Sequence, residues 1–198
     1  MALKFQYNKT ALQDLNKQLK VRRKALPTLK NKESALRLEV KRARDMIREL
    51  EQRIQDKHTE LDEFMKLTEF DPSLVKISSV RIDSRKIAGV QTPVLGEIEY
   101  ELAEINLFRA PTWFLDGVQL LKQVSELQIE QQLYHRKMQI LEYVRKKTTQ
   151  KVNLYEKVQI PAFETGILKI KRFLEDEENL SKAGQKILKN RMQSEVAL

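Results

Sequence analysis

The sequence predicts an all-α protein: a long antiparallel two-helix coiled coil whose helices are joined by a small central β-hairpin or short-helix cap. Of 198 residues, 33% are charged, and only five are glycine and five proline, which is typical of long helices with solvated charged faces. Apolar residues recur at heptad spacing in both halves of the chain, and this spacing breaks down between them. We therefore divide the chain into an N-terminal coiled-coil helix (residues 1–70), a central hairpin or cap (71–112) and a C-terminal coiled-coil helix (113–198).

The N-terminal helix is predicted by a 3,4-spaced register that continues from Leu12 to Thr68 without a slip. Thirteen of its 17 positions are apolar, and so long a stripe needs a second helix to cover it. Pro27 predicts a kink near residues 23–27, because proline removes a hydrogen bond and clashes with the preceding turn. The helix is expected to stop at Phe70-Asp71-Pro72. The register positions are Leu12, Leu15, Leu19, Arg22, Leu26, Leu29, Glu33, Leu36, Val40, Ala43, Ile47, Leu50, Ile54, Lys57, Leu61, Phe64 and Thr68.

The central segment has a different pattern, with β-branched residues between 75 and 82. Three helix breakers, Gly89, Pro93 and Gly96, then stand within eight residues. Residues 97–102 alternate between glutamate and apolar side chains, which is the pattern of a half-buried strand. A small β-hairpin or an irregular cap is therefore expected here.

The C-terminal helix is predicted by the return of 3,4 spacing from Leu120 to Leu141. The spacing blurs around residues 148–150 and resumes at Phe163, and Pro161 predicts a second bend. About 40 residues join the two helices, so they can fold back on each other with facing positions that sum to about 181. Because the return helix is then the longer one, its C-terminus is expected to project beyond the N-terminus.

The charge is uneven, since residues 1–48 carry 14 basic and 4 acidic side chains while the whole chain has a net charge of +9. Such a block can bind nucleic acid, an anionic membrane surface or an acidic protein, or can simply be a solvated helix face. Nucleic acid is disfavoured because no aromatic side chains for base stacking lie among the basic clusters.

Several classes of function are excluded. The chain has no cysteine, which rules out disulfides, thiol catalysis and cysteine–zinc sites. The glycines are too far apart for a phosphate-binding loop, and neither His58 nor His135 has a partner at metal-ligand spacing. No apolar stretch is long enough to span a membrane, and no secretory signal is apparent. We expect a soluble, intracellular, non-catalytic protein without cofactor or metal: a shaft in a larger machine, a prefoldin-like chaperone, or a coiled-coil scaffold whose basic face binds an anionic partner.

One stretch resembles a known family. Residues 147–161 read KTTQKVNLYEKVQIP, which is similar to the K-T-R-R-R-V-N-A-L-E-x-V-x-I-P hallmark of the D subunits of V-type (archaeal or vacuolar) ATP synthases. Residues 87–93 resemble the central I-x-G-V-x-x-P element of that family. Residues 29–32 and 167–178 resemble its early and late segments, in the expected order. The sequence departs from the family pattern in that the arginine cluster is reduced to Gln150 and Lys151 and Ala-Leu becomes Leu154-Tyr155, and Pro27-Thr28 stands where a glycine-containing helical stretch is expected.

The resemblance implies the central rotor of a V-type ATP synthase or ATPase, which carries torque between the hexameric head and H⁺ or Na⁺ movement through the membrane ring. The implied partners are the A and B subunits of the head, the small F subunit of the stalk and the C/d subunit that joins the stalk to the ring, on the cytoplasmic side of the membrane. The basic block is expected to face acidic groups of the head. The residues predicted to bind partners are Lys20, Arg22, Arg23, Lys24, Lys30, Lys32, Gly89, Val90, Pro93, Lys151, Asn153, Glu156 and Pro161.

Overall fold

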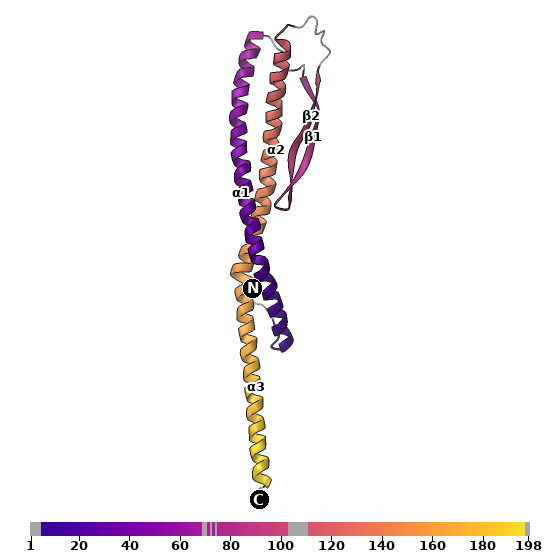
Figure 1. Cartoon of the computed structure of the whole chain (residues 1–198). Coiled ribbons are helices and arrows are strands. Elements are labelled where there is room, and N and C mark those ends of the chain that lie inside the picture. The colour runs from indigo at the N-terminus through magenta and orange to yellow at the C-terminus, as the bar shows by residue number, and fades with distance from the viewer. Residues whose placement is uncertain (1–4, 69–70, 72, 74, 103–110, 197–198) are drawn as a thin grey trace. The chain divides into compact units, whose positions relative to one another are not determined.

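The computed structural model describes residues 5–68, 71, 73, 75–102 and 111–196 and is mostly helical (Figure 1). A long N-terminal helix and a long C-terminal helical segment flank a two-stranded antiparallel hairpin. The elements are α1 (Lys9–Thr68), β1 (Val75–Ile87), β2 (Val90–Leu102), α2 (Phe114–Asn153), a π-helical segment η2 (Leu154–Gln159) and α3 (Ile160–Val196).

The chain divides into two compact units. Unit 1 contains Met1–Asn31 and Thr148–Leu198, and unit 2 contains Lys32–Lys147. Helix α1 therefore contributes its first part to unit 1 and the remainder to unit 2. The return segment, from α2 to α3, passes from unit 2 to unit 1. Most of α2 belongs to unit 2, and η2 and α3 belong to unit 1.

Helix α1 follows the register predicted from the sequence. None of the 17 register positions is exposed, and every fully buried side chain described in α1 occupies one of them. The helix continues through Pro27, which lies on the exposed side, so the kink at residues 23–27 stays a prediction. It ends at Thr68, whose hydroxyl donates to the carbonyl of Phe64 at 2.6 Å. The predicted stop signal at Phe70 and Pro72 falls outside the described residues.

The core of unit 1 is a cluster in which residues of α1 pack against α3. Leu15 and Leu19 meet Phe163, Ile167 and Ile170, and Ile170 is completely buried. Gly166 also lies against this core, because a Cβ placed there would stand 3.1 Å from the ring of Phe5. The three α3 residues belong to the apolar series that was predicted to resume at Phe163, so this part of the prediction is confirmed.

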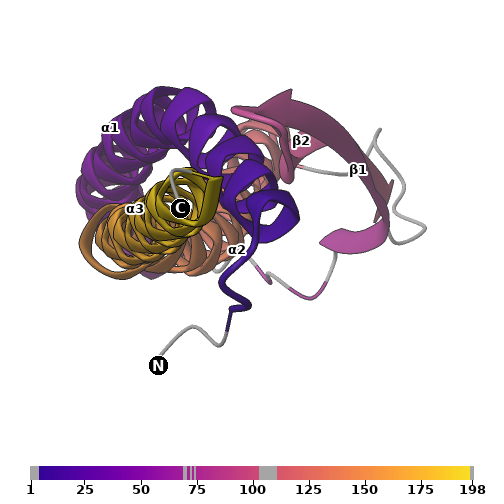
Figure 2. The ribbon, with the colours of Figure 1, turned by 90° about the horizontal axis from the view of Figure 1, so that it is seen from below.

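The core of unit 2 shows the direction of its helices. Leu36 and Val40 pack with Leu141, whereas Leu61 packs with Leu120 and Val124. Residue numbers rise along α1 as they fall along α2, so the two helices are antiparallel within this unit. The hairpin lies beside α2 in both ribbon views (Figures 1 and 2).

The β-hairpin confirms the strand alternative for the central segment. Ile87 pairs with Val90 next to the turn, Val75 pairs with Leu102 at the open end, and two register shifts interrupt the ladder. Residues 88 and 89 form the two-residue turn, with φ of 49° at Ala88 and 77° at Gly89. Positive φ at both positions is the mark of a type I′ turn, whose twist matches that of the strands it joins.

The return segment differs from the prediction at one place. The spacing was expected to blur around residues 148–150, but Thr148 and Val152 are buried and continue the apolar side of α2 toward η2. The irregularity lies further on, in the π-helical residues 154–159 that immediately precede Ile160 and Pro161. A threonine and a valine were harder to recognise as buried positions than leucines, and the irregular turn had no distinct composition.

Candidate partner-binding surfaces

Arg22 faces the return segment, and its guanidinium is used inside unit 1. Its Nε–H donates to Oε1 of Gln159 at 2.6 Å, and one terminal nitrogen donates to the carbonyl of Gln18 at 3.2 Å. The guanidinium carbon also lies 4.6 Å from the ring centroid of Phe163 and 5.8 Å from that of Tyr155. These contacts hold the side chain half-buried between the helices.

Two further members of the predicted basic set form ion pairs across the helices of unit 1. Arg23 pairs with Glu164 at 2.5 Å, and Lys30 pairs with Glu156 at 2.6 Å. All four side chains are more than two-fifths exposed, so each pair contributes only about 0.2–1 kcal/mol. Such pairs orient the two helices more than they stabilise them.

The other basic candidates have different surroundings. Lys20 and Lys24 are exposed on α1 beside Asn16 and Arg23, where they line an open surface hollow. Lys32 is half-buried in unit 2, and its ammonium nitrogen lies 3.7 Å from where a Cβ on Gly89 would stand. Lys20 and Lys24 are thus the members of this set best placed to meet another molecule.

The hairpin candidates combine turn geometry with packing. Gly89 supplies the positive φ that the turn requires, and Val90 is buried against Leu36, Val40 and Leu141. The sequence did not indicate that the hairpin tip would be anchored in this way, since a lone valine after a glycine carries no periodic signal. Val90 therefore has a structural role in unit 2, and the turn beside it remains available to a partner through exposed Gly89.

Pro93 follows on β2, opposite Ser84 of β1. It lines a cavity of about 150 Å³ between the hairpin and α2, together with Leu133 and Tyr134. Burial, and then the nearby Glu130 carboxylate, raise the pKa of the Tyr134 hydroxyl above its ordinary value. The cavity is too small for a drug-sized ligand, and it separates the strand from the helix.

The candidates on the return segment surround η2. Lys151, Asn153 and Pro161 are exposed, and Glu156 is the partner of Lys30 described above. No residue of η2 is fully buried. These side chains are exposed before, within and after the π-helical turn, where they are accessible to a partner.

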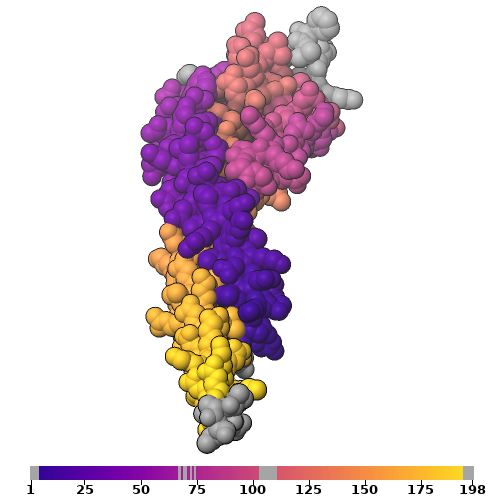
Figure 3. Space-filling view, turned by 60° about the horizontal axis from the view of Figure 1, so that its bottom comes forward, coloured from indigo at the N-terminus to yellow at the C-terminus, as the bar shows by residue number. Residues whose placement is uncertain are grey.

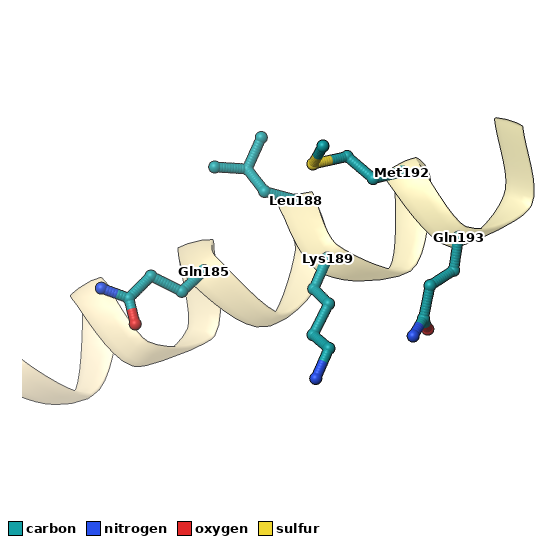
Figure 4. A pocket seen from close by; sticks show the side chains of 5 residues that line it. All are labelled: Gln185, Leu188, Lys189, Met192 and Gln193. Carbon is teal, nitrogen blue, oxygen red and sulfur yellow. The ribbon is translucent and has the colours of Figure 1, made fainter. Parts of the chain in front are cut away.

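A series of exposed apolar side chains on α3 was not among the predicted residues. Every described side chain of α3 from 175 to 193 is exposed, and the yellow end of α3 stands uncovered in Figure 3. Leu180, Ile187, Leu188 and Met192 are each more than half exposed. Leu188 and Met192 project from one side of the helix, whereas Lys189 and Gln193 point to the other side, so the hollow that they line with Gln185 is an open surface feature (Figure 4). The intervals between these apolar residues, seven, one and four positions, follow no single heptad series, so the predicted apolar series ends at Leu174.

Among the described residues, no group of three or more histidine, cysteine or acidic side chains is arranged to hold a metal ion. His58 is instead placed next to an amide, with its Nε2 at 2.8 Å from Nε2 of Gln128. No described helix combines the length and apolarity that crossing a bilayer demands.

Comparison with known proteins identifies the family. The family model for the D subunits of ATP synthases matches residues 11–190. The chain belongs to the family of ATP synthase D subunits. A Borreliella burgdorferi protein named as a V-type ATP synthase D subunit is 30% identical over 191 residues, which cover 94% of each chain. Proteins of the same name from Chlamydia caviae and Chlamydia pneumoniae are 29% and 27% identical, and the matches cover 85% and 81% of this chain and 84% and 79% of theirs.

Membership of this family places the chain in the central stalk of a V-type ATPase, as a non-catalytic subunit of a membrane-associated complex. The family resemblance found at residues 147–161 is thereby confirmed, since the match includes them. Free-standing scaffold and prefoldin-like roles are not favoured.

Proposed function

We propose that this chain is the rotor shaft itself, transmitting torque between ATP synthesis or hydrolysis in a hexameric head and H⁺ or Na⁺ translocation in a membrane ring. The observation that carries the proposal is the match to the family of ATP synthase D subunits, which extends over nearly the whole chain. The long helices support it, because a shaft must be stiff along its length and its two paired segments each have a buried apolar side.

The proposed shaft is an antiparallel two-helix coiled coil along its whole length, with the three-segment division at residues 70 and 112. Heptad positions that are buried or half-buried from Leu12 to Thr68 support this arrangement. Its proposed partners are the A and B subunits of the head, the small F subunit of the stalk and the C/d subunit that joins the stalk to the ring. The complex would then lie on the cytoplasmic face of the membrane.

The head contact is proposed to use the end of α3 and part of the basic block. Four large apolar side chains are exposed along this part of the helix, and exposed apolar surface of this kind is suited to a protein interface. Lys20 and Lys24 add exposed positive charge on α1, and contacts to acidic groups of the head at ~0.2–1 kcal/mol each are weak enough to allow rotation. The internal contacts of Arg22, Arg23 and Lys30 mean that substituting them would also alter the shaft.

The hairpin is proposed to contact neighbouring stalk subunits or to modulate ATP turnover, through the turn at Gly89 and the strand at Pro93. Outward-facing residues of β1 support this, since the strand is exposed over most of its length. The polar residues around η2, Lys151, Asn153, Glu156 and Pro161, complete the proposed contact set.

The test is co-purification of the tagged full-length chain from its native cell at low salt. Two large ATPase subunits and a small stalk subunit should be recovered in stoichiometric amounts.

Replacing Lys20 and Lys24 by alanine should lower the recovery of head subunits and should make that recovery less sensitive to salt. Replacing Lys41 and Arg44, exposed basic residues of α1 in unit 2, is the matched control. Recovery of the chain alone would contradict the rotor assignment, and equal recovery with both pairs of substitutions would contradict the assigned contact.

A further inference from the structure

The buried side of the return segment changes phase once. One series of buried or half-buried residues repeats every seven positions from Leu120 to Tyr155, and a second does so from Val124 to Gln159. Continued spacing would next bring residues 162, 166, 169 and 173 to the buried side. Ala162 is half-buried and Gly166 buried, but the residues that follow them, Phe163 and Ile167, are buried as well. Further along, the two patterns separate, because Ile170 is completely buried and Leu174 half-buried while Lys169 and Phe173 are exposed. The pattern after residue 160 is therefore displaced by one residue.

The displacement coincides with η2. In an α-helix each N–H bonds to the carbonyl four residues earlier, whereas a π-helical turn reaches five residues back and so contains one additional residue. The N–H of Ile160 bonds to the carbonyl of Tyr155, five residues before it. Such a turn can therefore accommodate one extra residue in the heptad pattern. Helix α1 keeps its spacing throughout, so the extra residue is on the return segment alone.

Pro161 explains why the wider turn is placed here. Proline has no N–H, so no α-helical bond to the carbonyl of Lys157 could form even in a regular helix. Its ring would also clash with that carbonyl, which gives a regular α-helix a cost at this position. A π-helical turn ending next to Pro161 thus sacrifices fewer main-chain bonds than one placed elsewhere in the segment.

The polar contact of Arg22 lies at the same level. Gln159, the last residue of η2, accepts the Nε–H of Arg22, and the guanidinium lies over Phe163, the first residue of the displaced pattern. Apolar side chains at heptad positions fit nearly as well after a slip of seven residues. A half-buried arginine whose partner is a single amide, as Arg22 has in Gln159, would lose that partner after such a slip. Buried polar pairs of this kind specify the register of helix pairs.

We propose that residues 154–159 accommodate a one-residue insertion in the heptad pattern, and that the Arg22–Gln159 pair locks α1 and the return segment in a single register at that point. Residues 154–159 and the Arg22–Gln159 pair both lie in unit 1, and the inference does not depend on which partners the chain binds.

Deletion of Val158 tests the insertion in the full-length chain. Val158 is exposed within η2, and removing it brings residues 163–174 back into phase with residues 120–155. The thermal midpoint should therefore stay within about 3 °C of the parent. Deletion of Arg136, an exposed residue in a regular part of α2, is the matched control. It moves Met138, Leu141 and Val152 off the buried side and should lower the midpoint by more than about 10 °C.

Circular dichroism measures both midpoints. If the two deletions lower the midpoint equally, residues 154–159 contain no tolerated extra residue, and the inference is overturned. If both deletions are tolerated, phase does not matter for this pairing, and the inference is overturned as well.

Distance measurements between two spin labels test the lock. The chain has no cysteine, so cysteines introduced at the exposed positions Lys20 and Glu177 are labelled uniquely. The parent should give one distance maximum. The double substitution Arg22→Leu with Gln159→Leu should add a second maximum, displaced by up to about 10 Å, the rise of seven helical residues. Lys57→Leu, which removes another polar register position, should not do so. An unchanged single maximum in the Arg22→Leu, Gln159→Leu protein would show that the pair does not set the register.

Discussion

Leu36 and Leu38 give the sharpest test of the helix packing in unit 2. They are the same residue type on the same helix, two positions apart, but Leu36 is 0% exposed and Leu38 is 50% exposed. Leu36 packs with Leu141, which is also completely buried, beside the tip of the hairpin. Alanine at each position makes the same chemical change, so any difference in stability reports the packing.

The expected magnitudes differ several-fold. Replacing a fully buried leucine by alanine costs about 2–5 kcal/mol, because transfer free energy is lost and a cavity remains. We expect about 3 kcal/mol for Leu36→Ala, which in a chain of this size lowers the thermal midpoint by roughly 6–12 °C. Leu38→Ala should change stability by about 0.5 kcal/mol, since half of that side chain is already in water.

Urea unfolding followed by far-ultraviolet circular dichroism measures both changes. The double substitution of Leu36 and Leu141 by alanine should differ from the sum of the two single effects by at least ~0.5 kcal/mol, because residues in contact are coupled. Equal destabilisation by Leu36→Ala and Leu38→Ala would refute the packing, as would strict additivity of Leu36 with Leu141.

Four other changes have distinct expected outcomes. Gly89→Val should destabilise the hairpin by about 1–2 kcal/mol because of its positive φ, whereas Gly184→Ala, with open space around it, should stabilise α3 by up to about 1 kcal/mol; urea unfolding distinguishes them. Glu130→Gln should lower the raised pKa of Tyr134 without restoring its ordinary value, since burial remains, as an ultraviolet titration would show. Because the pKa of Tyr134 is higher in the folded state than in the unfolded state, the neutral hydroxyl contributes to stability below pH ~10. This contribution is lost as the pH rises further and the hydroxyl ionises. Ending the chain after Leu174 should leave the thermal midpoint unchanged and weaken retention of head subunits in a pull-down, because the removed side chains described by the structure are exposed.

The sequence allowed α1 to be predicted almost completely, because leucine, isoleucine and valine at heptad spacing identify a buried side without further information. The same reasoning could not identify the buried residues of the return segment between residues 148 and 163. There the buried side includes, beside Val152, the residues Thr148, Tyr155 and Gln159, whose types are common on helix surfaces, and a one-residue change of phase follows. A search for one period cannot detect a series that changes phase.

The candidate site was less predictable than the fold. Counting charges identified Arg22 as one more member of a basic block, but its partner Gln159 is 137 residues away in the sequence. Val90 presented the same difficulty, since its burial depends on α1 and α2 and not on its neighbours in the chain. Long-range pairings of single residues carry no local pattern, so only the folded chain reveals them.

The uncovered end of α3 has a consequence for the life of the molecule in the cell. A helix whose side chains are all exposed opens at little cost in free energy, and proteases cleave segments that open readily. Residues 175–193 are therefore the part of the free chain expected to be cut first. If the proposed head contact covers these residues, copies of the chain that have joined a complex are protected from proteolysis. In surplus copies the same surface stays exposed, and these copies are degraded first.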